Sequence, residues 1–541
     1  MDKPLLVRPP TLAPKGMVCS PHALASAAGV DVLRAGGSAV DAAIAASAAL
    51  SVLYPHMTGI GGDAFWLIHE AGSRKVRYLA GGGRASRNAG LAWFEARGLR
   101  EIPLTGVLPA TLTVPGSVDS WCVAHAAYGR LPLARNLAQA VEYARDGFPV
   151  TERVAGAFEM ALDANVFNGE AKAIFLPEGR PPRAGERLVN RGLARVLERI
   201  GGAGREGFYA GETGRELAAF ARKEGGFFDE ADFERQRAQW GEPIRATYRG
   251  VEIFETPAPT QGFTVLEMLN LIEPFAIAKM DPLGPDVAHL LVEAKQLAFC
   301  DRDALLADPE FAPVPIERLI SKDYAAKRRA LISPERALAW DKVPSYGSLA
   351  GDTVYICVVD TEGNAVSLIH SVYSLFGSGV VAGDTGVVLQ NRSAYFSLDP
   401  AHPNRLEAGK RPLHTLIASM AFAESKLRHV FGCMGADGQP QIHLQGYVGM
   451  LDFGRNVQEA VDAPRWLSGR FGIGEPRDLL NIEGRFPAAT VAELERRGHQ
   501  VNLWPAWMEK AGHAHGISID PRNGMRIGGA DPRSDGAAIG Y

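Results

Sequence analysis

The sequence predicts a mixed α+β fold, in which runs with strand periodicity alternate with runs with helix periodicity. Two observations support this prediction. Short stretches rich in β-branched and aromatic residues, bounded by turn residues, occur within the first hundred residues and again after residue 245, whereas residues 117–223 have the apolar spacing of helices. Several mixed folds fit such a pattern, so it does not select one architecture.

Composition is typical of a globular protein. The 541 residues allow about three or four domains, although one large core of this length also occurs. Hydrophobic residues make up 46% of the chain, charged residues 22%, and the net charge is −4. Because no basic run or one-sided charge block is present, we expect neither a nucleic-acid partner nor a membrane-surface partner.

The cysteines and the N-terminal residues indicate the compartment. The cysteines are odd in number and far apart, so they form neither a disulfide framework nor a metal-binding spacing; they are Cys19, Cys122, Cys300, Cys357 and Cys433. Residues 1–10 lack the apolar core of a secretory signal. We therefore expect a reducing, cytoplasmic location.

The first two predicted elements are helices. One starts near His22 and ends at Gly36-Gly37, where glycine favours helix termination. The next covers Ala39–Tyr54, with Ser38 as N-cap and Asp41 three residues later as its capping partner. This apolar stretch is short for a membrane span and contains a carboxylate, so it indicates a buried helix.

Strands and helices then follow in turn. Residues 64–69 and 75–79 have strand character, and 117–223 are mostly helical. Strand character returns over 245–254, and a helix is predicted over 262–272. The polar stretch 341–348 contains Gly, Pro and Ser, which favours an exposed, mobile loop.

A hairpin is predicted directly after that loop. A β-branched strand begins at Thr353, a three-residue loop ends at Gly363, and a second apolar run continues to Ser371. If the strands pair symmetrically about Glu362, position 353 lies opposite position 371. The two hydroxyls would then meet with β-carbons within about 5.5 Å.

A threonine becomes a good nucleophile when a base lies beside it, and its own α-amine can be that base. Cleavage of the chain between Asp352 and Thr353 would free this amine, whose pKa of about 7.7–8.0 leaves it partly neutral at cellular pH. The hairpin alone equally allows Thr353 to be an ordinary first residue of a buried strand.

The segment beginning at Thr353 resembles a family pattern. It matches Thr-x-x-x-Ser-Val-Val-Asp-x-x-Gly-Asn-Ala-Val, with Cys357 at the serine position. Further blocks match in the same order along the chain, at residues 36–43, 59–63, 376–379, 410–413, 432–435 and 531–536. Together they resemble the γ-glutamyltransferase family of N-terminal-nucleophile hydrolases.

The resemblance implies a four-layer αββα sandwich and self-cleavage before Thr353. The fragments 1–352 and 353–541 would form a heterodimer that shares one core, and further oligomerisation stays open. In this interpretation Thr353 is the nucleophile and Ser371 hydrogen-bonds its hydroxyl. The substrate would be a small-molecule amide.

The resemblance also places an oxyanion-binding loop at residues 432–438. Two adjacent glycines of the family correspond here to Gly435 and Ala436, whose backbone N–H groups would be the donors. Alanine keeps the N–H but would be strained at positive φ. Without the resemblance, a tight turn after a strand over residues 428–431 explains the same glycines.

The substrate pocket departs from the family pattern. The arginine that binds the α-carboxylate in γ-glutamyltransferases corresponds to Gly82. A serine pair becomes His414 and Thr415, and the Asn and Asp that hold the α-amino group become Tyr373 and Tyr395. Replacing that Asp by tyrosine loses a charged hydrogen bond worth about 1.5–3 kcal/mol.

These changes together predict a different substrate. Arg392, close in sequence to Tyr395, could provide a cation for a smaller acid. The pattern is similar to the oxamate amidohydrolase branch and predicts hydrolysis of the amide of a small carboxylic acid. Alternatives stay open: tyrosines fill cores, Arg392 could be a solvated charge, and the chain could be a γ-glutamyltransferase or glutathione hydrolase, or an uncleaved, non-catalytic binding homologue.

Other catalytic patterns are missing from the sequence. It contains no Gly-x-Ser-x-Gly, no His-Glu-x-x-His and no phosphate-binding Gly-x-x-x-x-Gly-Lys-Ser/Thr. His513 and His515 lack acidic or cysteine companions at ligand spacing, so we assign them a solvated or structural role. We expect no metal and no cofactor.

Overall fold

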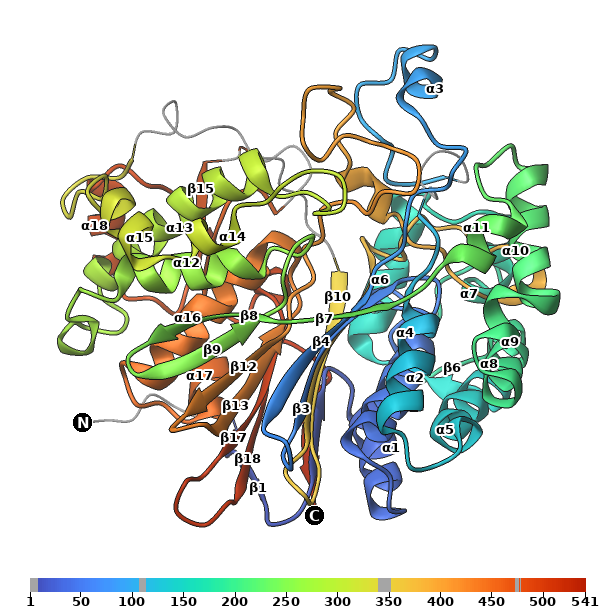
Figure 1. Cartoon of the computed structure of the whole chain (residues 1–541), viewed down its shortest axis with the longest axis horizontal. Helices are drawn as coiled ribbons and strands as arrows, with labels where there is room; N and C mark the ends of the chain where they lie inside the picture. The colour runs from blue at the N-terminus through green and yellow to red at the C-terminus, as the bar shows by residue number, and fades with distance from the viewer. Residues whose placement is uncertain (1–7, 107–112, 339–351, 472–475, 477) are drawn as a thin grey trace.

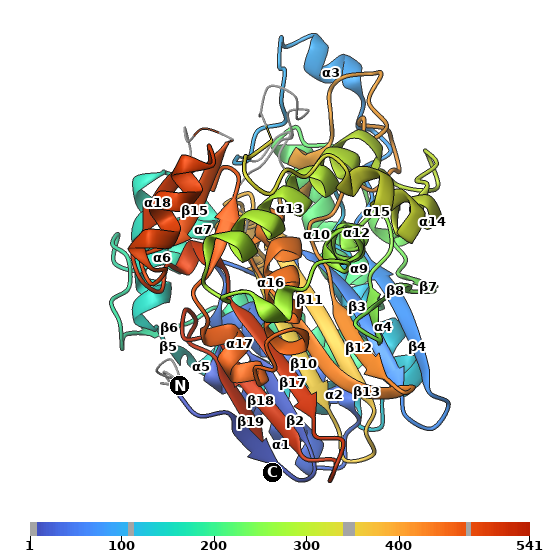
Figure 2. The ribbon, with the colours of Figure 1, turned by 90° about the vertical axis from the view of Figure 1, so that its left-hand side faces the viewer.

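The computed structural model describes residues 8–106, 113–338, 352–471, 476 and 478–541. The predicted loop over 341–348 lies outside these residues. The described residues form two large antiparallel sheets with helices on both sides, as Figures 1 and 2 show. The α+β class predicted from the sequence is confirmed.

The first sheet has seven strands, all paired antiparallel. In spatial order they are β1 (Thr11–Ala13), β18 (Arg526–Ala530), β17 (Ala514–Ile519), β13 (Lys426–Cys433), β12 (Ser419–Ala423), β9 (Val251–Glu255) and β8 (Ile244–Tyr248).

The second sheet also has seven antiparallel strands. Their order is β19 (Ala537–Gly540), β2 (Met17–Ser20), β10 (Asp352–Val359), β11 (Ala365–Tyr373), β3 (Asp63–Glu70), β4 (Lys75–Gly81) and β7 (Gln239–Gly241). Each sheet therefore combines strands from before and after Thr353.

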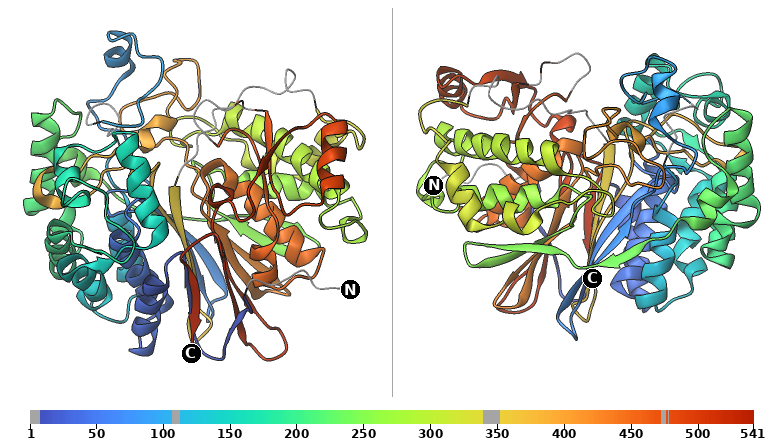
Figure 3. Two further views of the ribbon diagram at one scale, coloured as in Figure 1. Left: turned by 180° about the vertical axis from the view of Figure 1, so that it is seen from behind. Right: turned by 45° about the horizontal axis from the view of Figure 1, so that its top comes forward.

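One apolar cluster joins the two sheets. Phe65 and Cys357 come from the second sheet, Met420 and Ile517 from the first, and all four are buried in it. Alternate residues of a strand point to opposite faces, so the remaining apolar strand residues face outward toward helices. The views in Figure 3 show the helices on the two outer sides of the paired sheets.

The helices beside the second sheet come mainly from the first half of the chain. They are α1 (Ala23–Arg34), α2 (Ala39–Leu53), α4 (Ser117–Tyr128), α5 (Leu133–Asp146), α6 (Glu152–Asp163), α7 (Gly169–Phe175), α8 (Arg191–Ala203), α9 (Glu206–Tyr209), α10 (Gly211–Lys223) and α11 (Glu230–Arg235). Every residue of α2 is buried, and Ser38 and Asp41 form the predicted capping box at its start.

The helices beside the first sheet are α12 (Gly262–Ile272), α13 (Pro285–Leu305), α14 (Ile316–Leu319), α15 (Lys322–Arg329), α16 (Gln439–Leu451), α17 (Val457–Asp462) and α18 (Ala488–Arg496). Residues of α12, α13 and α16 share an apolar cluster with Ile253 and Phe431 of the sheet. The short α3 (Leu91–Glu95) lies at the periphery (Figure 1).

Smaller elements complete the described fold. A three-stranded sheet contains β14 (Trp466–Ser468), β15 (Leu479–Glu483) and β16 (Gln500–Trp504), and a two-stranded one contains β5 (Phe148–Pro149) and β6 (Arg187–Leu188). No helix among the described residues has both the length and the apolar character needed to cross a bilayer.

The strand character predicted over 245–254 is confirmed, and it belongs to two strands, β8 and β9, which pair as a hairpin. Arg249 and Gly250, between them, both have positive φ, at 53° and 78°. The apolar pattern continues through this tight turn, so periodicity alone did not reveal it.

Candidate active site

Thr353 lies at the open end of the β10–β11 hairpin, in the predicted register. Val354 pairs with His370, and a bulge then places Asp352 opposite Tyr373. The Thr353 side chain is buried, and its Oγ1 donates to Ser371 Oγ at 3.1 Å. The two hydroxyls therefore meet, as the hairpin symmetry predicts.

Ser371 Oγ accepts hydrogen bonds from two further donors. The Tyr373 backbone N–H lies 2.7 Å away, and Arg392 Nη2 lies 3.3 Å away. Donors that converge on one oxygen fix its position and stabilise negative charge that develops beside it. The arrangement can therefore hold the Thr353 hydroxyl in a fixed position.

Arg392 is fully buried, in the short 3-10 helix η4 (Arg392–Tyr395). Its Nη1 donates to Thr415 Oγ1 at 3.0 Å, and its guanidinium carbon lies 4.6 Å from the Tyr373 ring centre and 5.7 Å from that of Tyr395. Four predicted pocket residues are thus in contact. The alternative that Arg392 is a solvated surface charge is wrong.

His414, the fifth predicted pocket residue, lies beside this group. Its Nε2 is 3.5 Å from Asp63 Oδ2, and its ring centre is 4.7 Å from that of Phe65. Burial lowers the His414 pKa well below its ordinary value, and the nearby cations Arg392 and Arg411 lower it further. The imidazole is therefore neutral and able to form hydrogen bonds.

Asp63 is a site residue that the sequence analysis did not single out. It lies opposite Ser371 in the β3–β11 ladder, and its Oδ1 accepts from the N–H groups of Gly83 and Gly116 and from Gln390 Nε2. Burial raises the Asp63 pKa to about 7, against an opposing effect of Arg392. Its place at the end of the 59–63 glycine block was the available signal.

Gly82, at the position of the family's arginine, lies close to two side chains of the pocket. A Cβ atom there would lie 2.8 Å from Phe65 Cζ and 3.2 Å from His414 Nε2. A real Cβ is not accommodated at the first distance unless Phe65 moves. Two side chains of this pocket therefore crowd the point at which any longer side chain would begin.

Gly435 caps the 3-10 helix η5 (Ala436–Gly438) that follows β13, and Ala436 is the first residue of that helix. Both have positive φ, 131° and 45°, so the strain expected at alanine is present. Gln261 Nε2 donates to the carbonyl oxygens of Thr415 and Ala436, at 2.8 and 3.1 Å. This side chain joins the turn to the pocket.

A buried ion pair lies behind Gln261. Arg302 Nη1 donates to Gln261 Oε1 at 2.6 Å and to Asp437 Oδ1 at 2.5 Å. Both charged side chains are about 1% exposed, so their pairing is largely unscreened by solvent. No local sequence pattern indicates these three residues, because 135 positions separate Arg302 from Asp437.

His513 and His515 are fully buried, so the solvated alternative for them is wrong. The His513 carbonyl accepts from the N–H of Met434 at 2.9 Å, just before the Gly435 turn. The His513 backbone therefore supports the start of this turn. Burial lowers the pKa of both rings.

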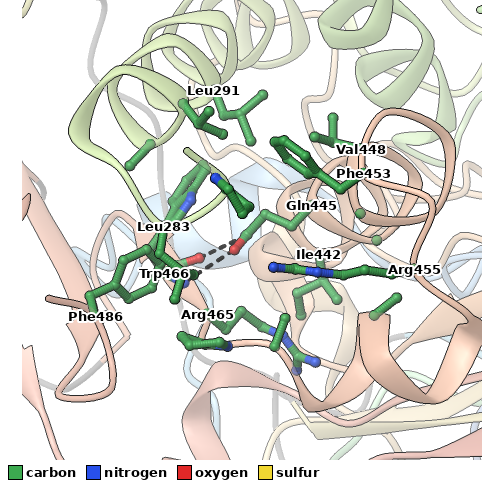
Figure 4. A pocket seen from close by; sticks show the side chains of 18 of the residues that line it. Leu283, Leu291, Ile442, Gln445, Val448, Phe453, Arg455, Arg465, Trp466 and Phe486 are labelled. Carbon is green, nitrogen blue, oxygen red and sulfur yellow. Dashed lines mark hydrogen bonds between the residues drawn. The ribbon is translucent and has the colours of Figure 1, made fainter. Parts of the chain in front are cut away.

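A separate pocket of the molecule contains none of the candidate active-site residues. Figure 4 shows it between α13 and α16, with Leu291, Ile442 and Phe453 among its apolar lining and Gln445 hydrogen-bonded to the backbone of Trp466. None of the predicted catalytic or pocket residues lines it.

Comparisons with known proteins identify the family of this chain. The family model described as gamma-glutamyltranspeptidase matches residues 25–541. The chain belongs to the gamma-glutamyltranspeptidase family. The matched region includes Thr353, every pocket residue described above and all strands of the two large sheets except β1 and β2.

Members of this family align with nearly the whole chain. The glutathione hydrolase-like YwrD proenzyme of Bacillus subtilis is 41% identical over 527 residues, covering 97% of this chain and 98% of the relative. The oxamate amidohydrolase proenzyme of Klebsiella pneumoniae is 38% identical over 532 residues, with the same shares covered. The crystal structure of cephalosporin acylase from Bacillus halodurans has a TM-score of 0.92 at 38% identity, covering 100% of this chain and 98% of that one.

Proposed function

We propose that the chain is an autoprocessing amidohydrolase whose nucleophile is Thr353, acting on the amide of a small carboxylic acid. The observation that carries this proposal is the buried hydrogen bond from Thr353 Oγ1 to Ser371 Oγ, with Arg392 on the same acceptor. The proenzyme names of the relatives support the self-cleavage. We assign the paired sheets and their outer helices to the four-layer αββα sandwich of N-terminal-nucleophile hydrolases.

Self-cleavage begins with the intact chain. Thr353 Oγ1 attacks the carbonyl carbon of Asp352, the Asp352–Thr353 C–N bond breaks, and the proton lost by the hydroxyl passes to the departing nitrogen. Water then hydrolyses the resulting ester. The products are the Asp352 carboxylate and a Thr353 that now carries both a free hydroxyl and a free α-amine.

Turnover uses this new N-terminus. The α-amine accepts the proton of Thr353 Oγ1 as that oxygen attacks the substrate amide, and later passes it to the leaving amine. Ser371 holds the hydroxyl, and the N–H groups of Gly435 and Ala436 stabilise the tetrahedral oxyanion. Ala436 retains its N–H, so the substitution of the family's glycine leaves both donors. Water releases the acid from the acyl-enzyme.

The pocket chemistry favours a small anion over a γ-glutamyl group. Arg392 provides a buried positive charge, and Thr415 and neutral His414 provide hydrogen-bonding groups. Tyr373 and Tyr395, with ring centres 4.8 Å apart, fill the space where a γ-glutamyl ammonium group would need a carboxylate. An oxamate-like substrate, with a carboxylate next to its amide, matches this set.

Denaturing electrophoresis tests the processing. The purified chain should separate into two fragments, and N-terminal sequencing of the smaller one should begin at Thr353. A chain that stays intact on prolonged incubation would favour the non-catalytic binding homologue instead.

A substrate comparison tests the pocket. Ammonia release from oxamate should exceed that from succinamate, which places two more carbons between carboxylate and amide, and both should exceed turnover of a γ-glutamyl anilide. Preference for the anilide would favour the glutathione hydrolase alternative and contradict the pocket argument. Adding an acceptor dipeptide separates hydrolysis from transfer.

A further inference from the structure

A second cluster of polar side chains lies between α13 and the residue before β16. Within the described part of the chain, its members form no hydrogen bond with Thr353 or the pocket residues. His289 and Glu293 are one helical turn apart on this helix, and His499 directly precedes β16. All three are buried, with exposed fractions of 2%, 1% and 6%. Their potential ligand atoms lie within 4.8 Å of one another, and no other such group of three is found within the described ranges.

The hydrogen bonds of His289 determine which of its nitrogens faces the cluster. His289 Nε2 lies 2.7 Å from the carbonyl oxygen of Ser333, which can only accept, so Nε2 carries a proton. His289 Nδ1 therefore presents its lone pair to His499 Nε2, 2.8 Å away, when the ring is neutral. A metal-binding histidine typically has this arrangement, with its other N–H donated to a carbonyl.

Glu293 is held in a similar way. Its Oε2 accepts from the backbone N–H of Leu338 at 2.9 Å, which orients the carboxyl group toward the two rings. Arg497 lies near both histidines, and Asp286 and Glu493 pair with its guanidinium. Two imidazole nitrogens and a carboxylate oxygen, all within 4.8 Å of one another, form a donor set of the kind that binds a divalent cation.

We propose that His289 Nδ1, His499 Nε2 and a Glu293 carboxylate oxygen bind one divalent cation, and that zinc is the preferred ion. Two histidines and one glutamate are an established zinc donor set, with a fourth position left for water. Zinc–nitrogen bonds of about 2.0–2.1 Å in tetrahedral geometry place two nitrogens about 3.3 Å apart. The two rings must therefore separate by roughly 0.5 Å from their present hydrogen bond.

The site would hold residues 333–338, which precede the proposed cleavage position. Ser333 and Leu338 are bonded to two of the three ligands, and Ala337 N–H donates to the Arg497 carbonyl at 2.8 Å. Residues 333–338 are the last described residues before Thr353's strand. A bound cation would reinforce both ligand contacts of this segment. The metal site does not depend on the proposed cleavage. None of its ligands or their hydrogen-bond partners lies at the Asp352–Thr353 bond, so they are the same in the intact and the cleaved chain.

The experiment measures metal binding by the full chain directly. Protein stripped with a chelator and dialysed is titrated with Zn²⁺, and separately with Co²⁺ to record the visible absorption of a four-coordinate site. We expect one equivalent bound. At a zinc concentration 100-fold above Kd, Tm should rise by about 2 °C for a chain of this length.

Two ligand variants and one control locate the site. Glu293→Gln keeps the size of the side chain and its acceptor for Leu338, and His499→Gln removes a nitrogen ligand; each should weaken zinc binding at least about tenfold and abolish the Co²⁺ absorption. His429→Gln is the control, because His429 lies on β13 and bonds Ser518 instead. It should bind like the unaltered chain.

Three results would overturn the proposal. They are failure of the unaltered chain to take up either ion, unchanged affinity in Glu293→Gln or His499→Gln, and equal loss in His429→Gln. The Co²⁺ spectrum of the unaltered chain decides the matter even if a ligand variant does not fold. Limited proteolysis gives a second readout, since chelation should increase cutting within residues 333–338.

Discussion

The two ends of the β10–β11 hairpin use the same pair of strands but differ in strain and in buried polarity. At the loop end, positive φ falls on Gly363, at 87°, and the Asp360 carboxylate accepts from the N–H groups of Glu362 and Asn364, both at 2.9 Å. At the open end, positive φ falls on Tyr373, at 85°, beside the fully buried Arg392.

This difference indicates that the loop end of the hairpin serves the fold, whereas the open end is built for the proposed reaction. Glycine takes positive φ without steric cost, whereas a residue with a Cβ in that region costs about 1–3 kcal/mol. A guanidinium taken out of water adds a further penalty. Strained backbone and buried charge persist where the surrounding structure enforces them, and here they surround the proposed nucleophile.

The largest effect should come from Thr353→Ala. Without the hydroxyl there is no attack on Asp352, so the chain should stay intact and amide turnover should fall by at least about 10³-fold. Electrophoresis and ammonia release measure both. Thr353→Ser is the matched control and should still be cleaved, more slowly; cleavage of the Ala variant would refute the role of Thr353.

Arg392→Lys should have the next largest effect. Lysine keeps the charge but cannot reach both Ser371 and Thr415 with a rigid fork, so kcat/KM should fall by about 10- to 100-fold, equivalent to roughly 1.5–3 kcal/mol. Steady-state kinetics measure it. Arg465→Lys alters an equally buried arginine that pairs with Asp531, and should affect stability rather than turnover. Equal loss of turnover in both variants would contradict a specific role of Arg392 in substrate binding or turnover.

Asp63→Asn tests whether ionisation of the carboxyl group beside Arg392 makes the stability of the protein depend on pH. The folded-state pKa of about 7 lies above the ordinary value of 3.8, because burial disfavours the carboxylate. Its stabilising contribution is therefore complete below pH 3.8 and is lost as pH rises to about 7. Unaltered protein should lose Tm over this range relative to Asp63→Asn.

The same ionisation should affect substrate binding. Above pH 7 the Asp63 carboxylate offsets the Arg392 charge, so KM for an anionic substrate should rise by about fivefold, on the order of 1 kcal/mol. In Asp63→Asn, KM should stay flat across pH 7. If KM depends on pH in the same way in the two proteins, the Asp63 charge does not influence substrate binding.

Gly363→Ala should act at the loop end alone. A Cβ there meets only Ala71 Cβ, at 3.6 Å, so the cost comes from the backbone, about 1–2 kcal/mol of unfolding free energy. Denaturant unfolding measures this loss, and turnover per folded molecule should be unchanged. A large loss of turnover would mean that the two ends are coupled.

Ala436→Gly should have the smallest effect. Glycine relieves the positive φ at 45° but gains freedom in the unfolded chain, so the free energy of unfolding should change by less than about 1 kcal/mol. Turnover should be retained because the N–H remains. A loss of more than about tenfold would indicate that the strained alanine conformation itself positions the oxyanion donor.

The sequence predicted those parts of the site that depend on neighbours along the chain. The pairing of Thr353 with Ser371 follows from a short loop and a period of two, which leave one register for the hairpin. The Ser38–Asp41 capping box was predictable for the same reason, since its partners are three residues apart. Family motifs then located Tyr373, Arg392 and Thr415.

The rest of the site depends on packing between distant elements. Asp63 reaches Ser371 because β3 pairs with β11, and Gln261 and Arg302 approach Asp437 because α12 and α13 lie against the first sheet. Likewise, His289 and His499 meet across 210 positions. Local propensities carry no information about such contacts, since they form only when the sheets and helices bury their apolar faces together. The hairpin and its proposed nucleophile could thus be predicted from the chain, whereas the charges that surround them required the assembled fold.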